Sequence, residues 1–231
     1  MECKQLLRKE YTVFVLSQGK RPASVRKFVE SLNLLEKDFY HLFADFEALE
    51  KDIFLSYFEE TRDKLQNDAA FKQYNGLEKI LAVYYTWFEV LKYHRSFISF
   101  LEKQKPFIVK AINFLPMGNW FIKFLAKQAL ATAPLYLLHI YEPFKETLKP
   151  ILNEAMGEEI AERFWISSKY NDVLWGASIL LYRFWLNDKS PDFERTDAAI
   201  EKSLNFVFDL LRPNAWDTGF DLVRFMWTKQ A

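Results

Sequence analysis

The sequence has few of the residues that crosslink, break or turn a chain. It holds one cysteine, six glycines and eight prolines among 231 residues. The single Cys3 excludes an internal disulfide and a cysteine-rich zinc site, and it fits a reducing compartment. Alternation of β-branched residues is scarce, whereas apolar residues recur at three- and four-residue spacing nearly throughout. This periodicity predicts an all-helical protein.

An excess charge of one sign and a long apolar run are also missing. Lys and Arg total 31 and so do Asp and Glu, so any nucleic-acid contact must come from local charge. The longest largely apolar run, residues 129–138, is shorter than the roughly 20 residues of a membrane-spanning helix. The first residues lack the uninterrupted apolar core of a secretory signal. We therefore expect a soluble, cytoplasmic protein without membrane contact.

The chain also lacks the motifs that would indicate catalysis. Its three histidines, at 41, 94 and 139, match no metal-ligand spacing. No phosphate-binding glycine loop and no nucleophile elbow is present. We predict that the protein is not an enzyme and that it has no cofactor and no metal site.

Helix-favouring patterns and aromatic residues are abundant instead. Aromatics make up 18% of the chain, which indicates wide packing surfaces or an aromatic-lined cavity. The periodicity predicts helices near residues 4–17, 24–31, 35–42, 46–66, 76–102, 106–113, 118–132, 135–155, 168–187, 191–211 and 216–229.

Residues 17–43 compress two short helix patterns and a tight turn, which is typical of a helix-turn-helix. Ser24 suits the N-cap of the helix over 24–31, and Asn33 suits a left-handed turn before the next helix. In residues 1–30 seven Lys and Arg outnumber three Glu, which gives a local basic excess; the alternative is an ordinary solvated surface. We predict a head over residues 1–46 and a body for ligand binding and dimerisation over 47–231.

Aromatic residues of the body are candidates to line a hydrophobic pocket, with filling of the core as the alternative. His139 lies on an otherwise apolar helix and is a candidate to orient a polar ligand group, or else to bond a neighbouring group. The predicted ligand-binding residues are Tyr84, Trp87, Phe88, Trp120, Phe121, Phe124, Tyr136 and His139.

Two long helices near the end of the chain are apolar on more than one face. Residues 173–186 are apolar almost all round, and the helix over 191–211 has two adjacent apolar faces. Such helices predict half of a four-helix homodimer interface, with burial inside a monomer as the alternative. The predicted interface residues are Trp175, Ile179, Tyr182, Ile200, Leu204, Val207 and Leu211.

The first sixty residues resemble the tetracycline-repressor (TetR) family of transcriptional regulators. The matching positions are Phe14, Gly19, Ser24, Phe28, Asn33, Leu34, Phe39, Tyr40, Phe43 and Leu49. The resemblance implies a three-helix head whose third helix enters the DNA major groove, a body with a small-molecule pocket, and a homodimer on a palindromic operator. The DNA-binding residues that it implies are Lys20, Arg21, Ser24, Arg26, Lys27, Lys37, Tyr40 and His41.

The third helix departs from the family pattern. Leu35 replaces a small hydroxyl residue, and Glu36 and Asp38 stand where basic, glycine or threonine residues are usual. Carboxylates repel phosphates and accept hydrogen bonds only from cytosine N4 or adenine N6 among the major-groove edges. Phe46 replaces the usual lysine after the Tyr-x-x-Phe element.

A second, local resemblance concerns the end of the body. The segment NDKSPDFERT, residues 187–196, with Trp175, Trp185 and the apolar helix before it, is similar to lipid-binding accessory proteins of ubiquinone biosynthesis that share the TetR fold. This resemblance implies a lipid or isoprenoid carrier, or a scaffold, that has lost DNA binding. The main hypothesis remains a TetR-like DNA-binding regulator that responds to a small hydrophobic effector.

Overall fold

The computed structural model describes residues 2–104, 134–156 and 164–211, and every regular element in these ranges is helical. The elements, in chain order, are α1 (Glu2–Gln18), α2 (Val25–Glu30), α3 (Glu36–Tyr40), α4 (Phe46–Asn67), η1 (Phe71–Gln73), α5 (Gly76–Tyr93), α6 (Arg95–Gln104), α8 (Leu135–Leu138), α9 (Tyr141–Met156), α11 (Phe164–Asn187), η3 (Pro191–Phe193) and α12 (Glu194–Leu211). The all-helical prediction is confirmed.

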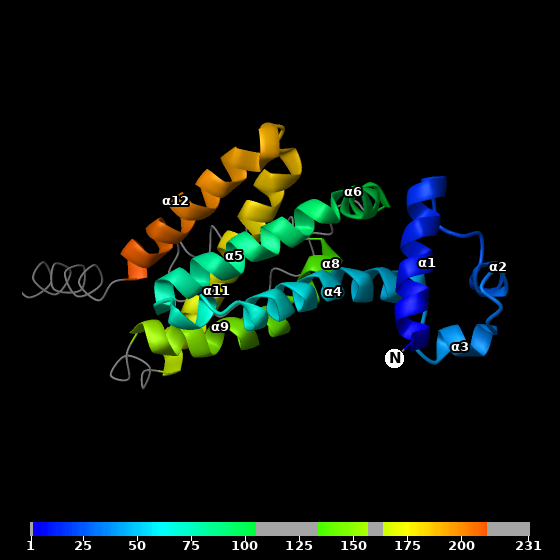
Figure 1. The fold of residues 1–231 in the computed structure, drawn as a ribbon, viewed down its shortest axis with the longest axis horizontal. Helices are drawn as coiled ribbons and strands as arrows, with labels where there is room; N and C mark the ends of the chain where they lie inside the picture. Colours follow the sequence, from blue (N-terminus) through cyan, green and yellow to red (C-terminus); the bar gives the residue numbers. More distant parts are fainter. Residues whose placement is uncertain (1, 105–133, 157–163, 212–231) are drawn as a thin grey trace, which may run out of the picture.

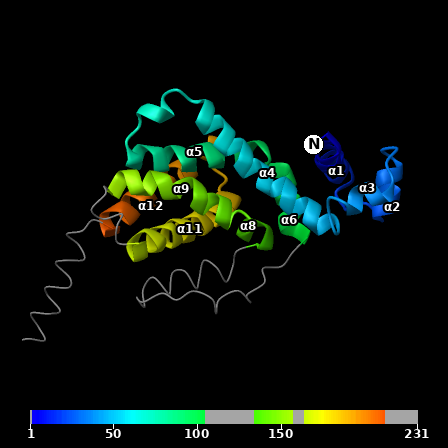
Figure 2. The ribbon, with the colours of Figure 1, turned by 90° about the horizontal axis from the view of Figure 1, so that it is seen from below.

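The first three helices lie together at one end of the long axis (Figure 1). From there α4 runs into the body, and the view from below shows the same separation (Figure 2). α1 packs against α4 and α6, whereas α5 packs against α4, α9 and α12. α11 lies against both α9 and α12. α4 and α6 therefore both connect the head with the body.

The local signals of the head are confirmed. The Ser24 hydroxyl accepts a hydrogen bond from the Lys27 backbone N–H at 3.2 Å and caps α2. Asn33 adopts φ 57°, the left-handed turn between α2 and α3. Asp45 caps α4 by accepting from the Ala48 N–H at 2.7 Å. Two short helices thus cross through a turn fixed by local chemistry.

The helix predicted over residues 76–102 is divided at His94. The His94 ring stacks on Tyr57 with centroids 3.9 Å apart, and its Nε2 lies 3.2 Å from Glu60 Oε2. The Arg95 guanidinium donates to the Trp185 and Leu186 carbonyls, at 3.0 Å each, and so satisfies the end of α11. These long-range contacts hold the break, which no proline or glycine marks.

Two other predicted helices are also divided. The pattern over 135–155 forms α8 and α9, which are separated by a turn at residues 139–140. The pattern over 191–211 starts as η3, where Asp192 and Phe193 have φ 51° and 63°. Helix η1 was not predicted. The helices predicted over 106–113, 118–132 and 216–229 lie outside the described residues.

The core of the body is aromatic. Trp87 contacts Phe58 and Phe144 with ring centroids 5.5 and 6.0 Å apart, and Phe144 also contacts Trp175 at 5.2 Å. All four rings are almost fully buried. Among the described helices, none has both the length and the apolar character to cross a membrane.

Candidate functional site

α3 presents one side to solvent at the outer end of the head (Figure 1). Phe39 is fully buried and anchors the helix, whereas Tyr40 is 54% exposed. Glu36, Lys37 and His41 are also exposed. Because residues three and four apart share a helix face, these side chains form one outward surface.

Asp38, one of the two unexpected carboxylates, has a structural role. Its Oδ2 accepts the Leu35 backbone N–H at 3.0 Å, which is the reciprocal bond of a capping box. The carboxylate thus satisfies a donor at the start of α3. Leu35, which stands in place of a hydroxyl residue, is 59% exposed and gives no side-chain cap.

Phe46, which replaces the family's lysine, belongs to the core of the head. Its ring stacks on Tyr11 at 5.2 Å and meets the edges of Phe28 and Phe39 at 5.8 and 5.6 Å. This cluster joins α1, α2, α3 and the first residue of α4. At the position where the family usually has a lysine, this chain therefore has a ring that packs into the aromatic core of the head.

Arg21, a predicted DNA contact, is held by a buried carboxylate. Its Nε and Nη2 donate to Glu50 Oε1 and Oε2 at 2.7 and 2.5 Å, and Tyr11 Oη donates to the same Oε1 at 2.6 Å. The hydrogen bond to Glu50 raises the pKa of Arg21, and burial, followed by the Glu50 charge, raises the pKa of Tyr11. Arg21 therefore joins the α1–α2 loop to α4, and its contact with phosphate stays a prediction.

The other implied DNA contacts divide into paired and exposed groups. Arg26 Nε donates to Glu30 Oε1 at 2.8 Å in an exposed pair, and the Ser24 hydroxyl is occupied in capping α2. Lys20, Lys27 and Lys37 are exposed and form no ion pair with a described residue. These three lysines, on or near α2 and α3, are cations of the head surface that remain available to phosphate.

A second ion-pair cluster ties α1 to α4. Asp52 Oδ1 lies 2.7 Å from Lys4 Nζ, and Asp52 Oδ2 lies 2.6 Å from Arg8 Nε. Burial raises the pKa of Asp52, but the bonds and charges of Arg8 and Lys4 outweigh burial and lower it. Together with the Glu50 contacts, these pairs attach the head to the first turns of α4.

The predicted ligand-binding residues that the structure describes do not share one surface. Tyr84, Trp87 and Phe88 are buried in the packed core, and the Tyr84 hydroxyl donates to the Leu174 carbonyl at 2.6 Å. His139 is exposed and lines a surface groove with residues at the start of α4, away from those rings. Its role in orienting a polar ligand group stays a prediction. Trp120, Phe121 and Phe124 lie outside the described residues.

A polar trio that the sequence did not indicate lies where α6, α8 and α11 meet. Tyr136 Oη and Tyr182 Oη both donate to Glu102 Oε1, the latter at 3.2 Å, and the two hydroxyls are 2.7 Å apart. Burial raises the pKa of Glu102, and the Tyr182 bond and the Arg183 charge offset only part of that rise. The α4 ring of Phe54 lies 4.6 Å from the Tyr136 ring.

Two further buried donors in the body have no acceptor in the described part of the chain. They are the indole N–H groups of Trp87 and Trp185. A buried donor without an acceptor costs about 1–3 kcal/mol, so such a group is commonly satisfied by water or by a ligand. In the same ranges, no three His, Cys, Asp or Glu side chains gather as a metal ion would require.

The predicted dimer residues face the interior of a single chain. Trp175, Ile179, Tyr182, Ile200, Leu204 and Val207 are each 5% exposed or less, and the side chain of Leu211 lies outside the described set. The periodicity assigned the wrong faces of α11 and α12, because both helices are apolar on the inward side as well.

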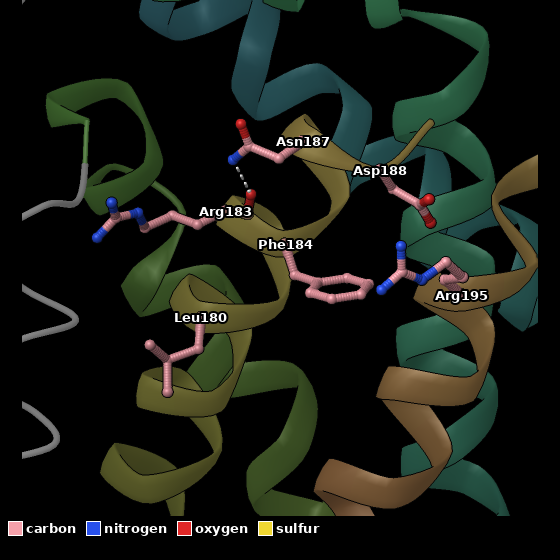
Figure 3. A pocket seen from close by; sticks show the side chains of 6 residues that line it. All are labelled: Leu180, Arg183, Phe184, Asn187, Asp188 and Arg195. Carbon is pink, nitrogen blue, oxygen red and sulfur yellow. Dashed lines mark hydrogen bonds between the residues drawn. The ribbon is translucent and has the colours of Figure 1, made fainter. Parts of the chain in front are cut away.

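Other apolar side chains on these two helices are exposed. Leu180 and Phe184 of α11 are 43% and 39% exposed, and Phe206 of α12 is 56% exposed. Figure 3 shows the Phe184 ring extending toward Arg195, whose guanidinium carbon lies 5.9 Å from the ring centroid. Among the described residues, α11 and α12 thus carry exposed apolar side chains as well as buried ones.

Comparison with known protein families gives a match for the C-terminal part of the chain. Residues 118–226 match the family described as tetracyclin repressor-like, C-terminal domain. This match and the all-helical fold of the described residues agree with the TetR-like resemblance of the first sixty residues. Comparisons with curated proteins and with solved structures found no match. The likeness to accessory proteins of ubiquinone biosynthesis stays a prediction.

Proposed function

We propose that this TetR-like protein is a homodimeric DNA-binding regulator whose body receives a small hydrophobic effector. The observation that carries the proposal is the exposure of Lys37, Tyr40 and His41 in and beside α3. This helix belongs to the head, which lies at one end of the molecule (Figure 1). A short helix anchored by a buried Phe39 and open on its other side suits entry into a major groove. No reaction is part of this role.

Phosphate binding falls to a smaller set than the sequence implied. Lys20 and Lys27 flank the start of α2, and Lys37 lies on α3. Arg26 joins them only if DNA displaces Glu30, because the two side chains form an exposed pair. Each lysine that neutralises a phosphate releases counterions, so the affinity depends on salt.

The second head comes from a second chain. Leu180, Phe184 and Phe206 offer apolar area on α11 and α12, the helices through which we expect the dimer to form. An isologous dimer places two α3 helices on successive half-sites, so the operator is palindromic.

Effector binding reaches the head through α4. Within two turns this helix carries Glu50, which holds Arg21 and Tyr11, and Phe54, which touches Tyr136 of the polar trio. A ligand that shifts the body side of α4 therefore acts on residues that position the head.

Capture of genomic DNA by the purified protein tests the proposal. We expect enrichment of a palindromic site, and weaker capture by the double variant Lys27→Ala, Lys37→Ala. The double variant Lys72→Ala, Lys149→Ala removes the same charge from exposed positions of the body and serves as the control. Equal, unselective recovery by all three proteins would contradict the regulator function.

One observation favours a second function, a carrier of a hydrophobic ligand without DNA binding. Arg21 and Arg26 are both paired with glutamates, and Glu36 adds a negative charge to the surface of α3. Native mass spectrometry of freshly purified protein distinguishes the two functions. A co-purified lipid together with no DNA capture would support the carrier, whereas empty protein that captures an operator would exclude it.

A further inference from the structure

α3 contains two acidic residues, and Glu36 is the one that does not cap the helix. Asp38 is occupied by the Leu35 N–H, whereas Glu36 is exposed and forms no hydrogen bond or ion pair with a described residue. Tyr40 follows one turn later and is 54% exposed, which places Glu36 on the same outward side. The carboxylate therefore lies on the side of α3 that would meet a major groove.

The described residues around Glu36 provide no ion-pair partner for its carboxylate. The charge of Glu36 acts on Arg26, whose pKa is raised mainly by its hydrogen bond to Glu30 and in addition by the charges of Glu30 and Glu36. Since Arg26 Nε is bonded to Glu30, Glu36 has no direct ion-pair partner among the described residues. Brought against DNA, such a carboxylate loses water and meets phosphate repulsion, so binding is unfavourable unless bases supply donors.

Only two bases supply a donor in the major groove. Cytosine presents the N4 amino group and adenine the N6 amino group, whereas guanine O6 and N7 and thymine O4 present lone pairs. We propose that Glu36 is a specificity-determining residue that selects, in each half-site, a base with an exocyclic amino hydrogen in the major groove. This inference rests on the proposed DNA-binding function.

Glu36 should attract a base that presents an amino hydrogen and disfavour guanine or thymine at the same position. A matched base gives Glu36 a charge-assisted hydrogen bond, whereas guanine or thymine at that position leaves the carboxylate unpaired against lone pairs. From the usual discrimination of base contacts, we expect binding about tenfold to a hundredfold weaker when the selected base is replaced. Removal of the carboxylate should strengthen binding to the rejected sites, because the repulsion disappears.

The test is selection from a random DNA pool with the wild type, Glu36→Ala and Glu36→Gln. We expect the wild type to require cytosine or adenine at one position of each half-site, and Glu36→Ala to accept all four bases there. Glu36→Gln should favour adenine, since an amide both donates and accepts. Circular dichroism and urea denaturation of each variant verify that the head remains folded.

Modified bases then identify the contacted group. N4-methylcytosine and N6-methyladenine keep Watson–Crick pairing but replace the major-groove amino hydrogen with a methyl group. Whichever modification matches the selected base should weaken the wild type about tenfold or more and leave Glu36→Ala unchanged.

Different results would refute the role of Glu36 and the proposed DNA-binding function. A wild type and a Glu36→Ala variant that select the same site, with the same response to methylation, would overturn the inference while leaving DNA binding intact. In that case Glu36 would serve only the N-terminal dipole of α3. A wild type that selects no DNA would overturn both the proposed function and the role of Glu36.

Discussion

Replacement of Glu50 by alanine should be among the most destabilising single changes in the head. The Glu50 side chain is 3% exposed and accepts three hydrogen bonds, two from Arg21 and one from Tyr11. Loss of one partner of a buried ion pair costs about 3–5 kcal/mol, and an orphaned buried hydroxyl costs about 1–3 kcal/mol. Because the Arg21 side chain is 34% exposed, water partly replaces its lost partner. We therefore expect a loss of about 4 kcal/mol in the free energy of unfolding.

Urea denaturation followed by far-ultraviolet circular dichroism measures this loss. Matched variants give a graded series: Glu50→Gln keeps an acceptor and should cost about 2 kcal/mol, and Tyr11→Phe removes only the hydroxyl and should cost about 1 kcal/mol. The double variant Glu50→Ala, Arg21→Ala should be less destabilised than the sum of its single variants, because Arg21 is no longer left unpaired. A Glu50→Ala protein within about 1 kcal/mol of the wild type, or strictly additive losses, would refute the reasoning.

Three further predictions concern other clusters. Phe46→Lys restores the family residue but removes a ring from the head core, so the free energy of unfolding should fall by about 2–3 kcal/mol in urea denaturation, with Phe46→Leu as the milder control. Glu102 has a raised folded-state pKa, so its contribution to stability is complete below the unfolded pKa of about 4.3 and is lost as pH rises through the folded pKa. Glu102→Gln should remove this decline, and parallel stability curves for the two proteins between pH 4 and 8 would contradict it. Burial raises the pKa of Asp188, but hydrogen bonds from Thr196 and Ser190 outweigh burial and lower it to about 2. Its contribution is therefore present above the unfolded pKa of about 3.9 and is lost as pH falls toward 2, so Asp188→Asn should flatten the acid limb of the stability curve.

Features fixed by local chemistry were predictable from the sequence. The Ser24 cap, the left-handed Asn33 and the apolar spacing gave the head and its helices, because each depends on residues within a few positions. Long-range contacts were not predictable. The break at His94 depends on Arg95 reaching carbonyls of α11 about ninety positions away, and the state of Arg21 depends on Glu50 in another helix.

The faces of α11 could not be assigned by periodicity. The helix carries apolar residues on all sides, so the pattern does not distinguish the buried Tyr182 from the exposed Phe184. Only packing against α9 and α12 decides which side faces inward. The sequence pattern likewise does not distinguish whether Tyr84 and Trp87 line a pocket or fill the core. In the structure both side chains are buried in the core.

The central claim, that the exposed surface of α2 and α3 binds DNA phosphates, is tested most directly by the salt dependence of operator affinity. Under the proposed function Lys27 and Lys37 each bind one phosphate, which makes four contacts per dimer. The slope of log K against log salt should then become shallower by about 3 to 4 in Lys27→Ala, Lys37→Ala. Lys72→Ala, Lys149→Ala should keep the wild-type slope. Identical slopes for all three proteins, or an affinity that does not respond to salt, would contradict the account.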